Sequence, residues 1–431
     1  MDCDVVIVGA GVSGLAAAAE LMSAGLDVRC LEAADRIGGR ILTVHDPRSP
    51  VPLELGAEFV HGRPAETWEL IRSHSLTAYE HTAKALHLRA GRVVNESQPG
   101  GLADRVLSQM ARSRRRHDET FETFLQRSRQ PAELKAWAAV HVEGFNAARR
   151  DRVSVKSLVR DDEAAGKIEG GRTFRILNGY DSIPQALEES IPDHQSVVRL
   201  NSVVEQVTWS RGRVAVQYRD GISGERTTMQ CSRLVVTVPL GVLQSRNDGR
   251  GTIRFDPEPA GTLRAARRLE FGQVYRITLR FAEPFWERDE RFHGAGFLLS
   301  REKRFFAWWT AHPIAAPILT GWMAGTAAED FQPADEQAVV AEALASLGRI
   351  LKEEIPTPEA HYFHDWRRDR FFRGAYSYVP AGAMRARAQL AAPVEDTIYF
   401  SGEATEVEGH SATVHGAIAA GIRTARQIAG K

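Results

Sequence analysis

The stretch Asp4-Val-Val-Ile-Val-Gly-Ala-Gly-Val-Ser-Gly-Leu15 predicts a buried strand, a tight turn and the start of a helix. Its apolar run is unbroken, as is typical of a strand that is covered on both faces. Gly9, Gly11 and Gly14 have the G-x-G-x-x-G spacing. The first glycine permits the turn, the second lets a diphosphate approach the backbone, and the third lets helix and strand pack closely. The unpaired amides at the start of the helix would favour the phosphate charge.

A second predicted strand, at 27–31, ends at Glu32. This position lies about 20 residues beyond the glycines, where an acidic side chain can bind a ribose 2′-OH. A glycine triad alone is weak evidence for a nucleotide site. Strand, turn, alanine-rich helix, second strand and terminal glutamate together predict a fold that binds an ADP-containing dinucleotide.

The segment Ala33-Ala-Asp-Arg-Ile-Gly-Gly-Arg40 resembles the extended signature of flavoproteins with two dinucleotide-binding domains. The resemblance implies that Gly38, Gly39 and Arg40 continue around the diphosphate and ribityl chain of FAD. A fold that binds only NAD has no need of Gly-Gly-Arg here, so FAD is the predicted cofactor.

The bulk composition excludes several classes of function. The chain has 431 residues, enough for two or three domains, and 55 basic residues balance 55 acidic ones. A basic run at 112–116 is followed at once by acidic residues, so we expect a solvated helix face and no nucleic-acid partner. Three scattered cysteines predict neither disulfides nor a metal site. No apolar stretch reaches about 18 residues, so we expect no membrane span. The first strand begins at the N-terminus, which leaves no room for a signal peptide and favours a cytoplasmic protein.

The rest of the chain alternates between two kinds of pattern. Apolar residues at helical spacing between Trp68 and about Arg160 predict a helical insertion that helps to wall a substrate cavity. Strands at 197–200, 203–209 and 214–218 predict a three-stranded meander.

Later segments complete the pattern. Residues 234–239 predict another buried parallel strand, and strict alternation at 274–281 predicts a half-exposed strand in a second sheet. The aromatic residues that follow position 280 belong to this second part, which we expect to bind the substrate. The last segment predicts a strand that ends at Gly402-Glu403 and a helix that opens near 411–418 and runs to about Ala429. The start of this helix would favour an electron-rich group.

Four separated motifs resemble flavin amine oxidases, the family of monoamine oxidases, polyamine and spermine oxidases and histone lysine-specific demethylases. They are the N-terminal glycine motif, Glu54-Leu-Gly-Ala57, Gly374-Ala-Tyr-Ser-Tyr378, and the pair Ser401-Gly-Glu403 and Ala412-Thr-Val-His-Gly-Ala417. Within this family the chain most resembles polyamine oxidases, because Ala57-Glu-Phe-Val-His-Gly62 looks like their segment with an active-site histidine.

The resemblance implies an α/β fold. A Rossmann-type FAD-binding domain would comprise residues 1–65, 169–244 and 385–431. An α+β substrate domain would comprise a helical part at 66–168 and a sheet at 245–384. The FAD-binding residues implied by the family motifs are Gly9, Gly11, Ser13, Gly14, Glu32, Gly38, Gly39, Arg40, Leu55, Gly56, Ala57, Glu58, Val204, Gly402, Glu403, Thr413, Val414 and Ala417.

The resemblance also implies the chemistry. A neutral amine would give a hydride equivalent from its α-C–H to flavin N5. The imine would then hydrolyse, and O2 would reoxidise the flavin and form H2O2. Tyr376 would be one wall of an aromatic cage, with Thr413 opposite it and Trp366 beside the flavin. Monoamine oxidases carry a flavin-linked cysteine where Ala375 stands here, so FAD should be noncovalent.

Two residues leave alternatives open. His61 is either an ordinary loop histidine with a satisfied hydrogen bond or a titratable group that faces the amine. Arg276 stands where the family lysine holds a water against flavin N5, and it keeps the cation but not a compact ammonium. Arg276 could instead anchor a carboxylate, which would favour an amino acid as substrate. Phe59 opposes that reading, because amino-acid oxidases carry an arginine at the position where it aligns.

Three functions therefore remain. The first is an FAD-dependent amine oxidase acting on a polyamine or another primary or secondary amine with O2. The second is an amino-acid or cyclic-amine oxidase or desaturase on the same fold. The third is a flavin-binding interaction protein with little turnover. A monomer or a homodimer is compatible with each.

Overall fold

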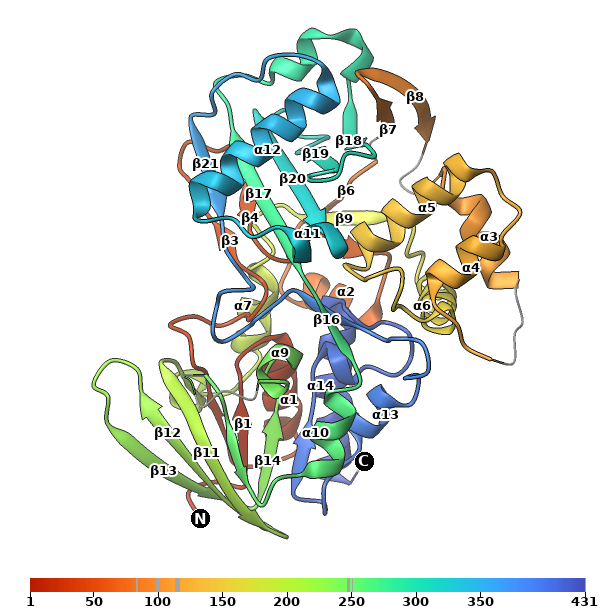
Figure 1. Ribbon diagram of the computed structural model, residues 1–431. Helices are drawn as coiled ribbons and strands as arrows, with labels where there is room; N and C mark the ends of the chain where they lie inside the picture. Colours follow the sequence, from red (N-terminus) through yellow and green to blue (C-terminus); the bar gives the residue numbers. More distant parts are fainter. Residues whose placement is uncertain (83, 98–100, 113–116, 246–248, 250, 431) are drawn as a thin grey trace.

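The computed structural model describes residues 1–82, 84–97, 101–112, 117–245, 249 and 251–430. Of the basic run at 112–116, which was interpreted as a helix face, residues 113–116 lie outside the described part of the chain. Two lobes are visible, with both chain termini in the lower one and helices α3 to α6 at one side (Figure 1). In the described part of the chain, no helix is long and apolar enough to cross a bilayer.

A five-stranded parallel sheet forms the centre of the lower lobe. The strand order is β10-β2-β1-β14-β23, with β1 (Val5–Val8) between β2 (Val28–Leu31) and β14 (Arg233–Val236). All the adjacent pairs are parallel. The strand β23 (Ile398–Phe400) closes one edge, so residues nearly 400 positions apart share one sheet. The α/β fold with a Rossmann-type sheet is thereby confirmed.

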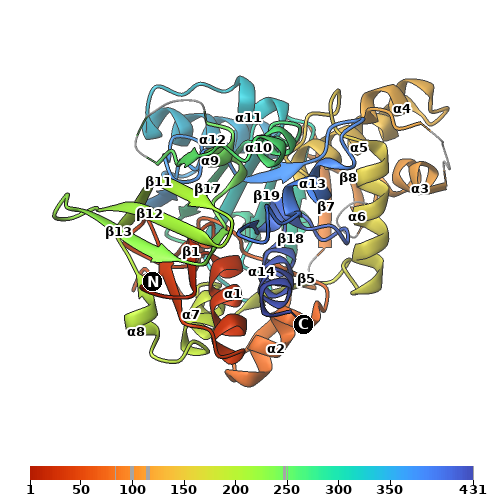
Figure 2. The ribbon, with the colours of Figure 1, turned by 90° about the horizontal axis from the view of Figure 1, so that it is seen from below.

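Two helices pack side by side on this sheet (Figure 2). They are α1 (Val12–Ser23), which follows the glycine turn, and α14 (Val414–Ala429). A Cβ on Gly421 would lie 2.2 Å from the carbonyl oxygen of Ser13, so the two helix backbones touch. The first and last nucleotide-type segments are therefore locked together by small residues.

The meander differs from the prediction in one strand. It contains β11 (Ser202–Ser210), β12 (Arg213–Asp220) and β13 (Arg226–Cys231), and a short parallel β15 (Arg254–Asp256) is added at its edge. The predicted strand at 197–200 is instead β10 (Val198–Arg199), which pairs with β2 in the parallel sheet. The third strand, β13, was missed because it is largely exposed and polar and lacks apolar alternation.

The upper lobe contains a seven-stranded sheet with the order β21-β17-β20-β19-β18-β7-β8. Its strand β17 (Val274–Arg280) was predicted to be half-exposed, but all seven of its residues are buried. Helix α12 (Glu336–Leu351) belongs to the hydrophobic core on one face of this sheet. The polar residues of β17 turn to the other side and pair with loops of the nucleotide part, as Arg276 does with Glu58. Alternation here marks a buried interface and not a solvent face.

The segment predicted to be helical from Trp68 to about Arg160 is helical only in part. After α2 (Ala65–Ser73), the chain forms β6 (Ala78–Glu80), β7 (Lys84–Arg89) and β8 (Arg92–Ser97). Strand β7 pairs in parallel with β18, so this hairpin extends the upper sheet. Its turn at Ala90-Gly91, between alternating residues, is the signal that the helical interpretation overlooked.

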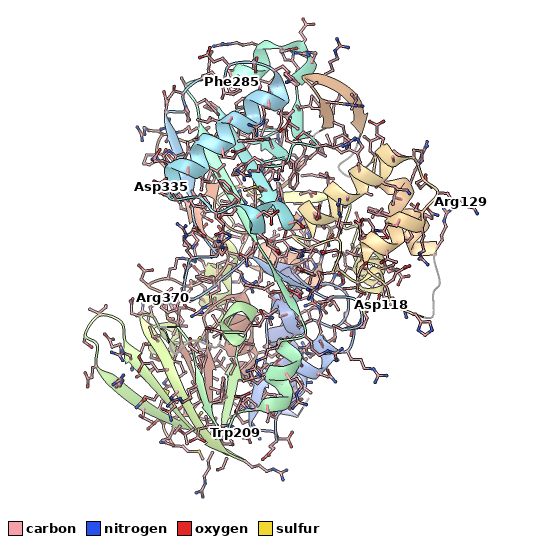
Figure 3. The ribbon with its side chains drawn as sticks, in the orientation of Figure 1. Asp118, Arg129, Trp209, Phe285, Asp335 and Arg370 are labelled. Carbon is pink, nitrogen blue, oxygen red and sulfur yellow. The ribbon has the colours of Figure 1, made fainter. Side chains whose placement is uncertain are left out.

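The helical part proper comprises α3 (Asp104–Arg112), α4 (Phe121–Arg127), α5 (Ala132–Phe145) and α6 (Val155–Lys167). In Figure 3, Asp118 and Arg129 mark this part, Phe285 and Asp335 the upper lobe, and Trp209 the meander. The residue limits of the five domain segments stay predictions.

The remaining elements connect these parts. They are β3 (Thr43–Val44), β4 (Leu53–Glu54), β5 (Val60–His61), β9 (Thr173–Ile176), α7 (Ser182–Glu189), α8 (His194–Val197), α9 (Leu240–Leu243), α10 (Ala260–Ala266), β16 (Glu270–Gly272), β18 (Ala295–Leu299), β19 (Ala307–Thr310), β20 (Ile318–Ala324), α11 (Thr326–Asp330), β21 (Ala360–Phe363), β22 (Tyr376–Tyr378) and α13 (Ala386–Ala391), with short 3-10 turns at Phe285–Arg288, Glu290–Phe292 and Glu403–Thr405.

Candidate functional site

A cavity of about 780 Å³ is lined by residues of both lobes. It runs from the loops that follow the parallel strands to the aromatic face of the upper sheet. Every residue predicted for the site lines this cavity except Gly14. A Cβ on Gly14 would lie 1.9 Å from the carbonyl oxygen of Gly9, so this glycine serves the contact between helix and strand.

One end of the cavity has the shape of a phosphate cradle. Gly9 has a φ of +106°, and a Cβ there would lie 2.6 Å from the Thr237 hydroxyl oxygen. Gly11 precedes α1 as its N-cap and supplies no side-chain cap, so no side chain of the cap competes for the first amides of the helix. Backbone donors with no side chain above them fit a diphosphate.

Glu32 is buried at the end of β2 beside this cradle. Its two carboxylate oxygens accept hydrogen bonds from the amides of Ala34 (2.8 Å) and Ala10 (2.7 Å). Burial raises the pKa of Glu32, and these two amides oppose the rise. The carboxylate is thus held at the position expected for a ribose contact. Val204, on strand β11, lines the same cavity and precedes the residues of β11 that pair with β15.

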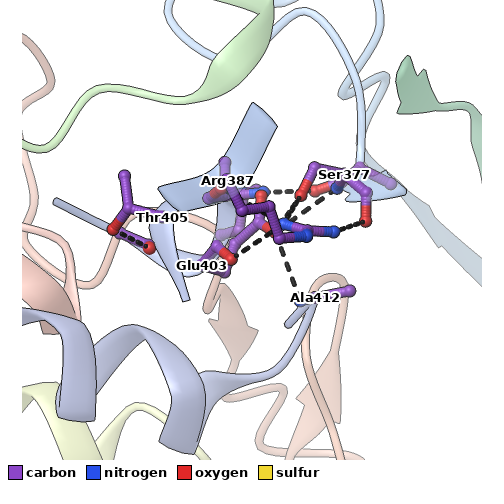
Figure 4. A network of polar contacts seen from close by, with 9 residues as sticks. Ser377, Arg387, Glu403, Thr405 and Ala412 are labelled. Carbon is purple, nitrogen blue, oxygen red and sulfur yellow. Dashed lines mark hydrogen bonds and ion pairs between the residues drawn. The ribbon is translucent and has the colours of Figure 1, made fainter. Parts of the chain in front are cut away.

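A buried ion-pair network holds the middle of the cavity wall (Figure 4). Arg40 lies 2.9 Å from Glu403 and also donates to the carbonyl oxygen of Ala375 at 2.7 Å. The second carboxylate oxygen of Glu403 accepts from the Ser377 hydroxyl at 2.6 Å and from the Ala412 amide at 3.2 Å. Glu403 therefore joins three separated segments of the chain.

The charge of Glu403 is secured by two cations. Burial raises its pKa, but Arg40 and Arg387 outweigh this effect and hold the pKa below its usual value. Arg387 is buried and donates to the Ser377 hydroxyl at 2.8 Å. Arg387 and Ser377 were not predicted, because their roles depend on contacts between α13 and β22 that leave no local pattern.

The other end of the cavity carries the predicted reactive residues. Tyr376 donates from its hydroxyl to the carbonyl oxygen of Phe145 at 2.9 Å, and burial raises its pKa, so it is a neutral ring. The Thr413 hydroxyl accepts a hydrogen bond from the Gly416 amide at 3.0 Å and donates one to the carbonyl oxygen of His410 at 2.6 Å. Its hydroxyl is therefore occupied as the N-cap of α14, which leaves Tyr376 as the aromatic wall.

His61 faces this end without a charged partner. Its ring meets Phe145 edge-on at 5.5 Å and lies 6.2 Å from the ring of Phe59. Among the described residues it has no hydrogen-bond partner, which disfavours the ordinary loop histidine with a satisfied bond. Burial lowers its pKa to about 4, so it is neutral near pH 7.

Arg276 is not a free cation. It lies 2.5 Å from Glu58 and donates to the carbonyl oxygen of Gly56 at 2.7 Å. Glu58 also pairs with Arg175 at 2.6 Å and accepts from the indole of Trp309 at 2.9 Å. Burial raises the pKa of Glu58, but the two arginines outweigh it and hold the pKa below its usual value. A substrate carboxylate would have to displace Glu58 to reach Arg276.

Trp366 holds the loop that lies between the two ends. Its indole donates to the carbonyl oxygen of Leu55 at 2.8 Å. A Cβ on Gly56 would lie 2.0 Å from the carbonyl oxygen of Arg40 and 3.2 Å from the Trp366 ring. The segment Leu55–Ala57 therefore packs closely against Arg40 and Trp366, and its three residues line the cavity.

Aromatic rings form most of the remaining wall. Phe59, Phe297 and Trp309 lie with ring centroids 5.9–6.2 Å apart. Trp309 lines the cavity whereas its neighbour Trp308 is fully buried behind the sheet. The sequence predicted aromatic lining from this region without the individual residues. The alternation of β19 is the signal that separates the two tryptophans.

No cluster of three or more potential metal ligands occurs in the part of the chain that the structure describes.

Comparison with known proteins agrees with this geometry. The sequence profile of the family described as flavin containing amine oxidoreductase matches residues 12–429. A polyamine oxidase 4 of Oryza sativa subsp. japonica is 28% identical over 98% of this chain and 87% of its own length. The human lysine-specific histone demethylase 2 is also 28% identical, over 99% of this chain but only 53% of its own length. A solved structure of putrescine oxidase, wild type bound to putrescine, has a TM-score of 0.82 at 24% identity and full coverage of both chains.

Proposed function

The chain belongs to the family of flavin-containing amine oxidoreductases, and from this premise we propose that it is an FAD-dependent oxidase of primary or secondary amines. The proposed reaction oxidises the amine at its α-carbon to an imine, which water hydrolyses, and O2 is reduced to H2O2. One observation carries the proposal: a single cavity joins the cradle at Gly9 and Glu32 to the aromatic wall at Tyr376.

The residues present fit FAD. The cradle at Gly9 and Gly11 suits the diphosphate, Glu32 the ribose, and the start of α14 an electron-rich ring edge. Ala375 lines the cavity and offers no thiol, which supports noncovalent binding. When bound, FAD would supply the oxidising group.

The task of the protein's own residues is then to orient and desolvate the amine. Tyr376 offers a neutral aromatic face for the amine nitrogen. His61 stays uncharged and adds no ion pair. Because an apolar wall disfavours charge, the cavity favours the neutral amine, which is the form that can react.

The ion pair between Arg276 and Glu58 favours amines over amino acids as substrates. Among the described residues of this wall, no unpaired cation is left to bind a substrate carboxylate. A polyamine is supported by the resemblance to polyamine oxidase 4, whereas the aromatic wall suits an amine with an apolar body. Location in the cytoplasm and a monomeric or homodimeric state stay predictions.

A substrate panel tests the proposal. Purified protein is mixed in air with a diamine, an arylalkylamine, a cyclic amine and several L-amino acids, and peroxide and carbonyl product are measured. We expect both products from the diamine or the arylalkylamine and none from the amino acids. Peroxide from the amino acids alone, or from the cyclic amine alone, would favour the second function. A yellow protein whose flavin no amine reduces would favour the interaction protein.

A further inference from the structure

A second, small cavity of about 30 Å³ lies behind Arg276. Its walls are polar as well as apolar, and they include Glu54, Glu58, Tyr79, Arg175, Arg276 and Thr320. Glu58 and Arg276 line both this cavity and the large one, so they form the partition between the two. A polar cavity of this size has room for an ordered water.

Two buried hydrogen-bond donors distinguish this cavity from an empty gap in the packing. The Nε–H groups of Arg175 and Arg276 are buried, and neither has a hydrogen-bond partner among the described residues. Both arginines are almost fully buried, with side chains 8% and 4% exposed. An unsatisfied charged donor is costly inside a protein, and a bridging water is the usual remedy.

The charges around the cavity do not balance without Glu54. Two guanidinium groups, Arg175 and Arg276, face one carboxylate, Glu58, so this trio has a net charge of +1. Glu54 is buried and accepts from the Thr43 hydroxyl at 2.6 Å and the Tyr180 amide at 2.8 Å. When Glu54 is ionised the four groups are neutral, and when it is protonated they carry one positive charge.

We propose that the small cavity is a water site that couples Glu54 to Arg276, and that Glu54 is a positioning residue whose charge decides whether the floor of the substrate cavity is neutral or positive. This inference rests on the proposed amine oxidase function. Glu54 itself does not line the large cavity, so it acts through Arg276 and Glu58.

The surroundings of Glu54 place its titration in the working range. Burial raises its pKa to about 7, against the hydrogen bonds from Thr43 and Tyr180. The charge of Glu58 adds to the rise and that of Arg276 opposes it. The other titratable groups that face it are Tyr79, Tyr180 and Arg175, and burial raises the pKa of both tyrosines.

The direction of the effect on the enzyme follows. Below pH 7 Glu54 is protonated, and the positive floor repels the second, still protonated amine of a diamine whose reacting amine is neutral. We therefore expect KM for a diamine to rise as the pH falls through 7, while kcat changes less. One unit charge across a partly buried wall changes binding by roughly tenfold.

The test combines infrared difference spectroscopy with steady-state kinetics on the holoenzyme. The wild type should show a protonated-carboxyl C=O band that titrates near pH 7. Burial also raises the pKa of Asp161 to about 7, so the Glu54 band is the difference between the wild-type and Glu54→Gln spectra. The KM of Glu54→Gln for a diamine should stay roughly tenfold above that of the wild type at pH 8.5. Thr43→Val removes a hydrogen bond that stabilises the ionised form, so the band should titrate at higher pH. Glu359→Gln, at a carboxylate paired with Arg280 elsewhere on β17, is the control and should keep the wild-type band.

Three results would overturn the proposal. The first is a difference spectrum of wild type and Glu54→Gln with no carboxyl band that titrates near pH 7, and the second is a Thr43→Val midpoint equal to that of the wild type. The third is a crystal structure in which no water lies within hydrogen-bonding distance of Glu54 or the arginine Nε atoms. The infrared titration and the crystal structure need no turnover, so they stand even if no amine proves to be a substrate. Thr43→Val decides the matter if Glu54→Gln does not fold.

Discussion

A Cβ on Gly56 would lie 2.0 Å from the carbonyl oxygen of Arg40, closer than any side chain can approach a backbone oxygen. The two residues belong to the two loops that we assign to FAD, and Trp366 closes the space from the other side. The backbone at Gly56 therefore fixes the distance between the nucleotide loops and the reactive end of the cavity.

We expect Gly56→Ala to push this loop into the cavity. Overpacking of this kind costs roughly 1–3 kcal/mol, and here it would also reduce the room for the cofactor. The measurements are the thermal midpoint and the ratio of flavin to protein after purification. Gly261→Ala is the control, because a Cβ there meets nothing within 4 Å in helix α10 and alanine favours the helix. A Gly56→Ala protein that keeps full flavin content would show that the close approach is not required.

Tyr376 allows the ring and the hydroxyl to be separated. Tyr376→Phe keeps the aromatic face and loses one hydrogen bond to Phe145, worth about 1 kcal/mol, so the rate of flavin reduction should fall less than about tenfold. Tyr376→Ala also removes the face and should slow reduction much further. Anaerobic stopped-flow measurement compares the two. Equal losses in both variants would place the hydroxyl, and not the ring, at the reacting nitrogen.

His61 gives a prediction for acid stability. Its pKa is about 4 in the folded protein, below the usual value of 6.5, so below pH 6.5 the unfolded chain binds a proton that the folded chain does not. The stabilisation that neutral His61 contributes to the folded protein is thus fully present above about pH 7, and it is lost as the pH falls toward 4. His61→Phe should lose less of its thermal midpoint between pH 7.5 and 5 than the wild type.

The control for His61 is His293→Gln, at an exposed histidine, which should follow the wild-type curve. A His61→Phe curve parallel to the wild type would mean that the pKa of His61 is not lowered in the folded protein.

Arg276 tests the ion pair with Glu58. Arg276→Lys keeps a cation, but a single ammonium cannot replace the two guanidinium nitrogens that donate to Glu58 and to the Gly56 carbonyl oxygen. We therefore expect the free energy of unfolding to fall by about 1–2 kcal/mol. Arg276→Met leaves Arg175 as the one described cation paired with Glu58 and should cost more, up to roughly 3–5 kcal/mol. Chemical denaturation measures both. A fully stable Arg276→Met would show that the pair does not support the fold.

The same two variants also test the substrate class. If Arg276 bound a substrate carboxylate, Arg276→Met would lose activity on an amino acid selectively. We expect instead that amines remain the substrates of every variant that folds.

The sequence predicted the nucleotide-binding part well because its signals are local. The signals for the glycine turn, the strand that ends at Glu32 and the start of α14 each lie within a few residues, and these elements form where predicted. The upper lobe was harder to predict from the sequence. The hairpin β7–β8 and the burial of β17 depend on partners distant in sequence, and a period-2 pattern cannot tell a buried polar interface from solvent.

The site shows the same division. The predicted residues surround one cavity, but the state of each depends on a partner from another segment. Glu58 pairs with Arg276, and Phe145 accepts from Tyr376. Neither pairing has a spacing that a single sequence reveals, because each joins segments more than 200 residues apart.

The most direct test of the central claim is an anaerobic titration of the purified protein followed by its visible spectrum. The account predicts a yellow protein that releases intact FAD on denaturation. Its oxidised band should bleach on addition of an amine and return on admission of O2, with peroxide formed in equal amount. A protein that stays colourless after reconstitution with FAD would contradict the account.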